Sequence, residues 1–254
     1  MKLEQGIESY LELLKKVILF EIWQEHEEDL YSGLVYKDSA VNPEKHRMGE
    51  IWPKCAHSMI GKMRMDNLQM CMETVLRENI EGDFIETGVW RGGACIFMRG
   101  FLKVHGVDDR KVWVADSFEG VPVPNEKKYP KDKGGLGLHT LDYLRVSLEE
   151  VQNNFRKYGL LDESVQFLKG WFKDTLPTAP IEKLAILRLD GDLYESTMDS
   201  LTNLYDKVSY GGFIIVDDYI LPTCEPAIKD FRNAHNIKEP LIPIDNHAVY
   251  WRKW

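Results

Sequence analysis

From residue 83 onward, short β-rich apolar runs alternate with helical stretches, and this alternation constrains the fold more than any other feature. The runs are DFIETG, KVWVADS, VQFLKG, LAILRLDG and GGFIIVDD, and they are separated by stretches such as LEEVQNNFRKYGLL and STMDSLTNLYDKV. The alternation predicts an α/β fold with a mostly parallel, doubly wound sheet. The last two runs, EPLIPID and NHAVYWRKW, are joined by a short turn at residues 245–246 and predict an antiparallel pair at the sheet edge.

Four aspartates stand at the ends of two of these strands. Asp190 and Asp192 end the run at 184–192, and Asp217 and Asp218 end the run at 211–219. If the strands are neighbours, their carboxyl ends open on one crevice, where packed carboxylates repel one another unless a cation lies between them. Oxygen ligands without His or Cys suit Mg²⁺, Mn²⁺ or Ca²⁺. Asp192 alone could be a helix N-cap, but the set of four favours a metal site.

A turn rich in glycine follows the first strand, in FIETGVWRGG at 84–93, and a helix begins near Gly92. The glycine spacing is not GxGxxG, which disfavours a dinucleotide-cradling turn. Glu86 stands just before the turn, where a carboxylate can meet a cationic ligand. Asp116 ends the next strand and is placed to hydrogen-bond a ribose diol.

The sequence predicts an N-terminal part at 1–80 and an α/β domain at 81–254. The N-terminal part contains an amphipathic stripe in ESYLELLKKVILFEIWQ, a long irregular segment at 30–57 and a second helical stretch at 59–79. Irregular segments of that length are disordered or act as active-site lids, and the first helix is expected to serve as a cap or a dimer interface. A Pro- and Gly-rich interruption at 120–143 is predicted to be the substrate loop.

Composition excludes several classes of protein. The formal net charge of -9 over 254 residues argues against a nucleic-acid partner, which would need a basic face. The longest apolar runs are only a few residues, so no membrane span is expected. The four cysteines lack CxxC spacing and the N-terminus does not read as a signal peptide, which together indicate free thiols in the cytoplasm.

Longer strings resemble the macrocin O-methyltransferases, class I enzymes that use S-adenosylmethionine to methylate sugar hydroxyls and related oxygens on antibiotics. The resemblance rests on ETGVWRGGACIFMRG, VWVADSFEGVP, NNFRKYGLLD, GWFKDTLPTAP, LRLDGDLYESTMDSL, GGFIIVDDY and the terminal VYWRK. It implies a Rossmann-like methyltransferase sheet with an N-terminal helical cap. It is weakest before residue 54 and in the 121–143 loop, where an acceptor would be chosen.

The resemblance also implies roles for particular residues. The cofactor residues would be Glu86, Gly88, Arg91, Gly92 and Gly93 on the turn, Asp116 and Ser117 at the ribose, Met59 and Ile60 in a closing segment, Gly170 and Trp171 beside the adenine, and Asp190 at the border of the metal site. Asp190, Asp217 and Asp218 would hold Mg²⁺, and Asp192 would be the general base. His139, Tyr194 and Tyr219 are weaker candidates for substrate contact and could equally be surface or packing residues.

The predicted function is therefore S-adenosylmethionine- and Mg²⁺-dependent O-methylation of a metal-chelated diol, on a deoxysugar of a macrolide-like natural product. Catechols and phenols remain alternative acceptors, because a metal chelates either kind of vicinal diol. The DGD sequence at 190–192 also resembles the DxD of metal-dependent glycosyltransferases, and a non-catalytic cofactor-binding subunit is a further alternative. The expected partners are a small-molecule substrate and further copies of the chain, as a homodimer or higher homo-oligomer.

Overall fold

A seven-stranded sheet forms the centre of the molecule in the computed structural model, which describes residues 2–133 and 136–254. Its strand order is β3-β2-β1-β4-β5-β7-β6. The strands are β1 (Asp83–Thr87), β2 (Val112–Asp116), β3 (Val165–Lys169), β4 (Leu184–Leu189), β5 (Val208–Val216), β6 (Ile242–Pro243) and β7 (Val249–Arg252). Strands β1 to β5 pair in parallel, and β7 pairs antiparallel with both β5 and β6. The predicted mostly parallel sheet with an antiparallel edge is confirmed.

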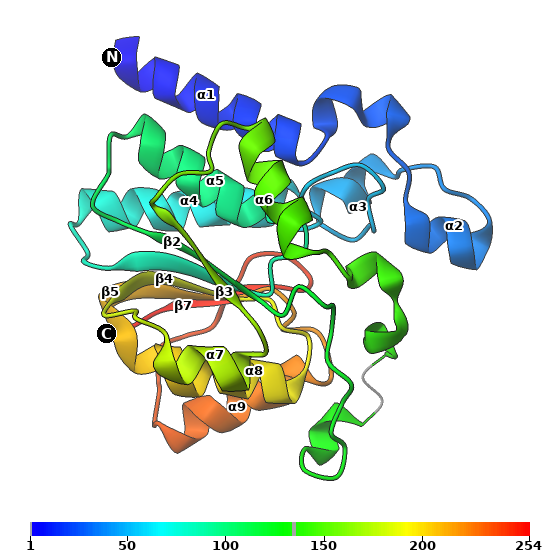
Figure 1. Cartoon of the computed structure of the whole chain (residues 1–254), viewed down its shortest axis with the longest axis vertical. Helices are drawn as coiled ribbons and strands as arrows, with labels where there is room; N and C mark the ends of the chain where they lie inside the picture. The colour runs from blue at the N-terminus through cyan, green and yellow to red at the C-terminus, as the bar shows by residue number, and fades with distance from the viewer. Residues whose placement is uncertain (1, 134–135) are drawn as a thin grey trace.

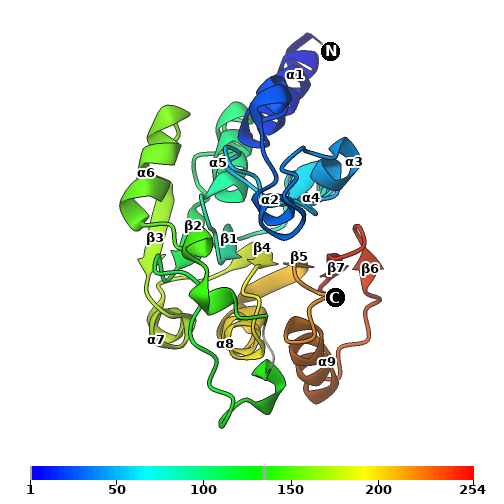
Figure 2. The ribbon, with the colours of Figure 1, turned by 90° about the vertical axis from the view of Figure 1, so that its right-hand side faces the viewer.

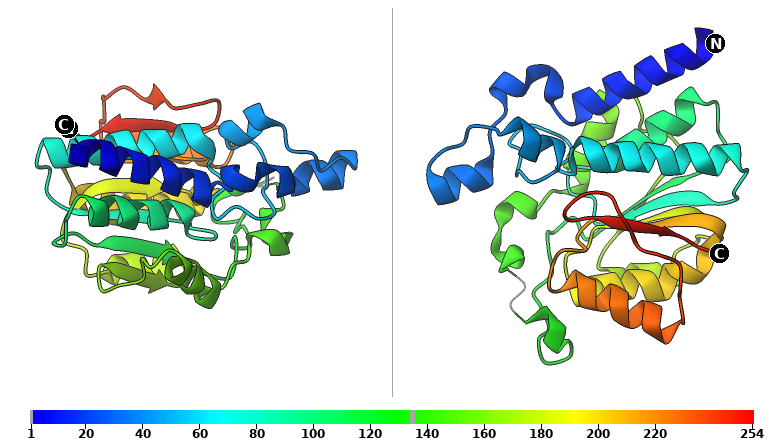
Figure 3. Two further views of the ribbon diagram at one scale, coloured as in Figure 1. Left: turned by 90° about the horizontal axis from the view of Figure 1, so that it is seen from above. Right: turned by 180° about the vertical axis from the view of Figure 1, so that it is seen from behind.

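Helices cover both faces of the sheet (Figures 1 and 3). One layer contains α4 (Gly61–Arg77), α5 (Gly93–Val104) and α6 (Leu148–Lys157), with α1 (Lys2–Ile18) packed over α5. The other layer contains α7 (Phe172–Thr175), α8 (Tyr194–Leu204) and α9 (Cys224–Ala234), with the short 3₁₀ turns η5 (Leu176–Thr178) and η6 (Tyr205–Lys207). Because both faces are covered, every residue of β4 is buried, as expected for a parallel strand inside an α/β fold.

The segment at 30–57 is not irregular throughout, so that expectation is wrong in part. It contains α2 (Leu30–Tyr36) and α3 (Pro43–Arg47). The side chain of Asp29 accepts hydrogen bonds from the first amides of α2, and Asn42 does the same for α3. These caps supply partners for amides that a short helix leaves unpaired, and they stabilise helices too short to show an apolar period.

The first amphipathic stripe is also shorter than its pattern indicates. Helix α1 ends at Ile18, and Phe20 takes a left-handed conformation with φ of 60°. A separate 3₁₀ segment, η1 (Glu21–His26), follows it. The apolar residue Ile22 therefore belongs to η1, where it is 40% exposed, and not to the buried face of α1.

Two segments outside the sheet flank the edge at which the parallel strands end (Figure 2). One is the N-terminal segment with α2 and α3. The other is the connection from β2 to α6, which contains the 3₁₀ turns η2 (Pro130–Asp132), η3 (Leu138–Thr140) and η4 (Asp142–Leu144). Gly134 and Gly135 of the predicted substrate loop lie outside the described residues. Among the described helices, none is long and apolar enough to cross a membrane.

Candidate active site at the carboxyl edge of the sheet

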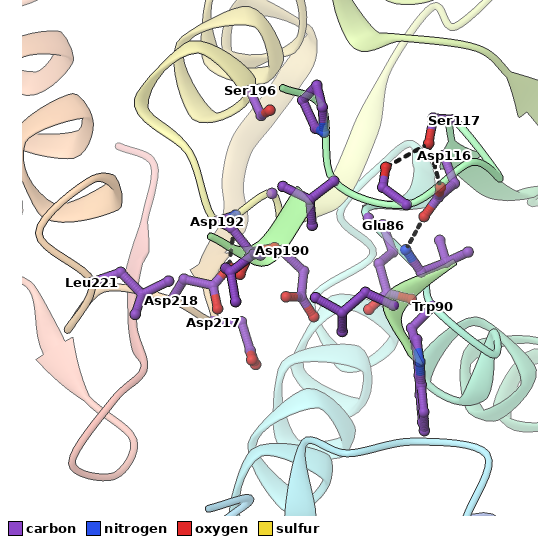
Figure 4. Close-up of a pocket in the computed structure, with 18 of the residues that line it drawn as sticks. Glu86, Trp90, Asp116, Ser117, Asp190, Asp192, Ser196, Asp217, Asp218 and Leu221 are labelled. Atoms are coloured by element: carbon purple, nitrogen blue, oxygen red, sulfur yellow. Dashed lines mark hydrogen bonds between the residues drawn. The ribbon is translucent and has the colours of Figure 1, made fainter. Parts of the chain in front are cut away.

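A cavity of about 660 Å³ opens where β1, β2, β4 and β5 end, between the two flanking segments. It brings together most of the residues that the sequence singled out. Its lining includes Met59, Ile60, Glu86, Gly88, Asp116, Ser117, Trp171, Asp190, Asp192, Asp217 and Asp218. Figure 4 shows the four aspartates on one side of this cavity and Glu86, Asp116 and Ser117 on the other. The predicted meeting of two acidic strand ends therefore occurs, and it occurs beside the glycine turn.

Three of the aspartates form a compact oxygen cluster. Asp190, Asp217 and Asp218 each present a carboxylate oxygen, and these oxygens lie within 4.8 Å of one another. Asp192 adjoins them, and its backbone N–H donates to Asp218 Oδ2 at 3.1 Å. Asp192 has φ of 58°, a left-handed conformation that turns the chain sharply after β4. It is not the N-cap of α8, since that position is Leu193.

A buried arginine, which the sequence reasoning missed, lies beneath this cluster. Arg188 on β4 is 1% exposed, and it is the ladder partner of Glu86 on β1. Its guanidinium donates to Glu86 Oε1 and Asp217 Oδ1, and to Asp190 Oδ2 at 2.7 Å. One side chain thus orients the carboxylates of three strands. The available signal was a single arginine inside the apolar run LAILRL, where a charge must find buried partners.

A second guanidinium comes from α4. Arg64 donates to Asp217 Oδ2 at 2.6 Å and to Asp245 Oδ2 at 2.7 Å, and its Nη2 lies 3.0 Å from His247 Nδ1. Both oxygens of Asp217 therefore accept hydrogen bonds from arginines. Arg64 lies on α4, whereas Asp245 and His247 lie on the β6–β7 turn, about 180 positions later in the sequence. No local sequence pattern indicated this pairing.

Burial, together with an excess of carboxylates over the two guanidiniums, raises the pKa of three aspartates in this region. Burial and the neighbouring Asp217 raise the pKa of Asp190, and burial and Asp192 raise the pKa of Asp218 well above its usual range. Burial, Asp190 and Asp217 likewise raise the pKa of Asp192. Oxygen donors held together at such a cost fit a hard divalent cation, for which Asp217 would be a ligand shared with the arginines.

On the other side of the cavity, two acids are held by the protein itself. Asp116 Oδ2 accepts the Val89 amide at 2.8 Å and Oδ1 accepts the Phe118 amide at 2.7 Å, so the carboxylate has a fixed orientation. Glu86 is 2% exposed, pairs with Arg188 and accepts from Cys95 Sγ at 3.0 Å. Burial raises the pKa of Glu86 to about 7. Arg188 therefore supplies a positive charge of the kind that Glu86 was predicted to meet in a ligand.

The glycines of the turn allow close approach of the chain to itself. A Cβ on Gly88 would lie 1.7 Å from the carbonyl oxygen of Asp190, and Gly88 has φ of 88°. A Cβ on Gly93 would lie 2.4 Å from the carbonyl oxygen of His57. The turn is therefore packed against the end of β4 and against the N-terminal segment, and its glycines are required for that packing.

Arg91 binds the N-terminal segment rather than lining the cavity. Its Nη1 donates to the carbonyl oxygens of Lys54 at 3.0 Å and Ala56 at 2.8 Å, and its guanidinium lies 4.1 Å from the centre of the Trp90 ring. These contacts hold the segment that carries Met59 and Ile60 over the cavity. Gly92, Gly93 and Gly170 also lie outside the lining.

The three weaker substrate candidates are not brought to the cavity wall. His139, Tyr194 and Tyr219 do not line it. The Tyr194 hydroxyl instead donates to Asp230 Oδ2 at 2.8 Å, and Tyr219 packs against the core of the α8–α9 layer. Another part of the cavity is lined by apolar side chains from two loops, namely Val121, Pro122, Val123, Leu136, Leu138, Ile220 and Leu221. Val123, Leu136 and Ile220 are 74%, 65% and 54% exposed, so this part of the lining is the mouth of the cavity.

Comparison with known proteins identifies the family of this chain. The family model for macrocin-O-methyltransferase (TylF) matches residues 7–253. Demethyldecarbamoylnovobiocin O-methyltransferase of Streptomyces niveus is 52% identical, over 96% of this chain and 93% of that protein. The 8-demethyl-8-(2,3-dimethoxy-alpha-L-rhamnosyl)-tetracenomycin-C 4'-O-methyltransferase of Streptomyces olivaceus is 48% identical, over 98% and 94%. The solved structure of the O-methyltransferase NovP superposes with a TM-score of 0.89 at 51% identity, over 97% and 99%. The chain is an O-methyltransferase and belongs to the macrocin O-methyltransferase family.

Proposed function

We propose that this enzyme transfers a methyl group from S-adenosylmethionine to a hydroxyl of a metal-chelated diol, on a deoxysugar of a macrolide-like or similar antibiotic. The observation that carries the proposal is the shared cavity, in which the clustered Asp190, Asp217 and Asp218 adjoin Asp192 and lie across from Glu86 and Asp116. The name of one relative supports a sugar acceptor, since it specifies a rhamnosyl group.

The methyl donor would occupy the side of the cavity lined by Glu86, Gly88, Asp116, Ser117 and Trp171. Asp116 is preset by two backbone amides and retains lone pairs for a ribose diol. Trp171 follows β3 and offers an indole face to a base. Met59 and Ile60 would cover the donor, and Asp190 would border it. Arg91 would act by holding the segment that carries Met59 and Ile60. Gly92, Gly93 and Gly170 would act through the shape of the backbone.

The metal would be Mg²⁺, held by Asp190, Asp217 and Asp218. When bound, such an ion lowers the pKa of a hydroxyl oxygen and fixes its position. Arg188 and Arg64 hold Asp217 in place, and Arg188 also holds Asp190. These contacts leave the ligand set with little freedom to rearrange, which favours a fixed acceptor geometry.

Asp192 would act as the general base. It lines the cavity beside the metal cluster, and its left-handed backbone is tied to Asp218. It would take the acceptor hydroxyl proton as the oxygen forms its bond to the methyl carbon and the carbon–sulfur bond breaks. The products are a methyl ether, S-adenosylhomocysteine and a proton on the carboxylate, so atoms and charge balance.

The mouth of the cavity supports an acceptor with a large apolar body. Val123 and Ile220 are 74% and 54% exposed, whereas Glu86 and Asp217 are 2% and 5% exposed. The apolar part of the lining therefore lies nearer the solvent than these acids. A sugar would then reach the aspartates while its apolar scaffold packs against the loops. A small catechol would leave these apolar side chains without a partner.

The test is transfer of label from methyl-labelled S-adenosylmethionine. We expect label on demethyldecarbamoylnovobiocin or another glycosylated antibiotic, and much less on catechol or caffeic acid of equal concentration. Preferred labelling of the catechols would contradict the sugar assignment. Absence of label from every acceptor, with S-adenosylmethionine bound, would favour a non-catalytic subunit, and transfer of a sugar from a nucleotide sugar would favour a glycosyltransferase.

The enzyme would act in the cytoplasm as a homodimer or higher homo-oligomer. Its four cysteines are free, which suits a reducing compartment. Exposed apolar side chains gather on the N-terminal elements, with Leu13 54% exposed, Trp23 45% and Leu34 77%. Self-association would cover them. Light scattering should give at least twice the mass of the chain, and a monomer at micromolar concentration would contradict this.

A further inference from the structure

The loop that lines the mouth of the cavity is fastened to helix α8 through a buried carboxylate. Asp132 in η2 is 0% exposed. Its Oδ1 accepts the Tyr194 amide at 2.6 Å and its Oδ2 accepts the Glu195 amide at 3.1 Å. Helix α8 has no capping side chain of its own at Leu193, so a residue 62 positions away in sequence supplies the cap. A carboxylate at a helix N-terminus is favoured both by the free amides and by the helix dipole.

Two neighbours reinforce this attachment. Lys131 forms a salt bridge with Asp230 of α9, and the Tyr194 hydroxyl donates to the same carboxylate at 2.8 Å. The Tyr129 ring lies 6.1 Å from the Tyr194 ring. These contacts are more exposed than Asp132 and contribute less each, since exposed ion pairs are screened by water. Asp132 is therefore the principal link between the loop and the helix layer.

The helix end that Asp132 caps is continuous with the proposed general base. Asp192 is separated from Tyr194 by one residue. The carbonyl oxygen of Asp192 accepts from Thr223 Oγ1 at 2.5 Å, and its amide donates to Asp218. Asp192 is thus held on one side by the β5–α9 connection, and on the other side by a helix whose first turn depends on Asp132.

The loop on both sides of Asp132 forms the acceptor end of the cavity. Val121, Pro122, Val123 and Asn125 precede it, Leu136 and Leu138 follow it, and all line the cavity. Glu195 and Ser196 of α8 line the same cavity. On the methyl-donor side, Glu86 pairs with Arg188, and Asp116 accepts from the Val89 and Phe118 amides, so neither acid is held by Asp132.

We propose that Asp132 is a positioning residue, which fixes the acceptor-binding loop and Asp192 relative to one another by capping α8. The proposal rests on the proposed function, because it takes this end of the cavity to hold the acceptor. It states that acceptor binding depends on Asp132 and that donor binding does not.

The experiment compares Asp132→Ala and Asp132→Asn with the unaltered enzyme, using demethyldecarbamoylnovobiocin as acceptor. We expect Asp132→Ala to raise the acceptor KM about tenfold or more, while the Kd for S-adenosylmethionine changes less than twofold. Hydrogen exchange should accelerate in peptides covering residues 121–131 as well as in those at the start of α8. Asp132→Asn keeps one oxygen that can accept a hydrogen bond from α8, so its acceptor KM should fall between those of Asp132→Ala and the unaltered enzyme.

Ser147→Ala is the matched control, because Ser147 caps α6 through the Glu150 amide and lies outside the cavity lining. It should leave the acceptor KM unchanged. The proposal would be overturned if Asp132→Ala accelerated hydrogen exchange only in α8 and left the acceptor KM normal. It would also be overturned if the Kd for S-adenosylmethionine rose as much as the acceptor KM. If the unaltered enzyme methylates no acceptor, the proposed function fails whatever the role of Asp132. Hydrogen exchange still tests that role, because unchanged exchange at residues 121–131 in Asp132→Ala would overturn it.

Discussion

At the scale of single residues, charge explains why the site could be predicted only in part. The acids stand at strand ends, where the sequence pattern itself indicates a shared edge, so Glu86, Asp116 and the four aspartates could be found without coordinates. The residues that hold them could not. Arg64 and Asp245 meet across 181 positions, and only folding reveals that pairing. Arg188 was visible as a charge inside an apolar strand, but its partners were not.

Asp192→Asn provides the test at this scale. The amide keeps the shape of the side chain but cannot take a proton, so kcat should fall about 100-fold or more, the usual size of a general-base contribution. Binding of S-adenosylmethionine and of the metal, measured by calorimetry, should change little. Asp108→Asn, at an exposed position outside the cavity lining, serves as the control. A near-normal rate in Asp192→Asn would remove the assigned role.

At the scale of elements, the periodicity of apolar residues predicts long helices and misses short ones. The stretch at 59–79 forms α4 as expected, because a long amphipathic pattern survives local detail. Helices α2 and α3 depend instead on the caps Asp29 and Asn42, which could equally have been read as turn formers. The attachment of this segment to the rest of the molecule depends on Arg91 and on His57, which lies 2.6 Å from the Tyr158 hydroxyl of the α6 end.

His57 gives this attachment a pH dependence. Burial, together with Lys157 and Arg91, lowers the pKa of His57 from 6.5 to about 4. The unfolded chain therefore binds the extra proton between these values, so stability is fully present above pH 6.5 and is lost as the pH falls toward 4. In the unaltered protein, the free energy of unfolding measured with urea should fall between pH 6.5 and 4, with His57 contributing on the order of 1 to 2 kcal/mol after allowance for its partial exposure. His57→Gln should lack this contribution.

A matched histidine distinguishes this effect from general acid sensitivity. His26 is exposed in η1, and its side chain is 72% accessible. His26→Gln should keep the slope of the unaltered protein, since its ring is in water in both states. Equal slopes in all three proteins would show that His57 is not responsible.

At the scale of the whole molecule, the strand order places the site. Strands β1 and β4 are adjacent although they lie about a hundred residues apart, and the helices that follow them, α5 and α8, cover opposite faces. Ligands in open α/β sheets bind at such a reversal. The alternation of strands and helices predicted the class of fold and this edge. The path of the loop across it depends on long-range contacts, such as that of Asp132, which no periodicity encodes.

Metal binding should be visible in the stability of the whole chain. A ligand that binds only the folded state at a hundred times its Kd adds about 2.7 kcal/mol, which corresponds to a Tm increase of about 5 to 10 °C for a chain of this size. We expect Mg²⁺ to raise Tm by this order and EDTA to abolish activity. Asp218→Asn should lose the increase in Tm. Full activity in EDTA would remove the metal from the proposed chemistry.

The buried anchor at Asp132 has a consequence for redesign. The principal attachment of this loop to the helix layer is one carboxylate and two amides. We therefore expect that the loop could be replaced by another segment, provided that the incoming segment brings an equivalent carboxylate to the same place. A transplanted segment without this carboxylate would carry side chains suited to a new acceptor but would not be attached to the start of α8. We therefore expect that acceptor specificity could be changed by replacing this loop alone, without altering the sheet that would bind the methyl donor.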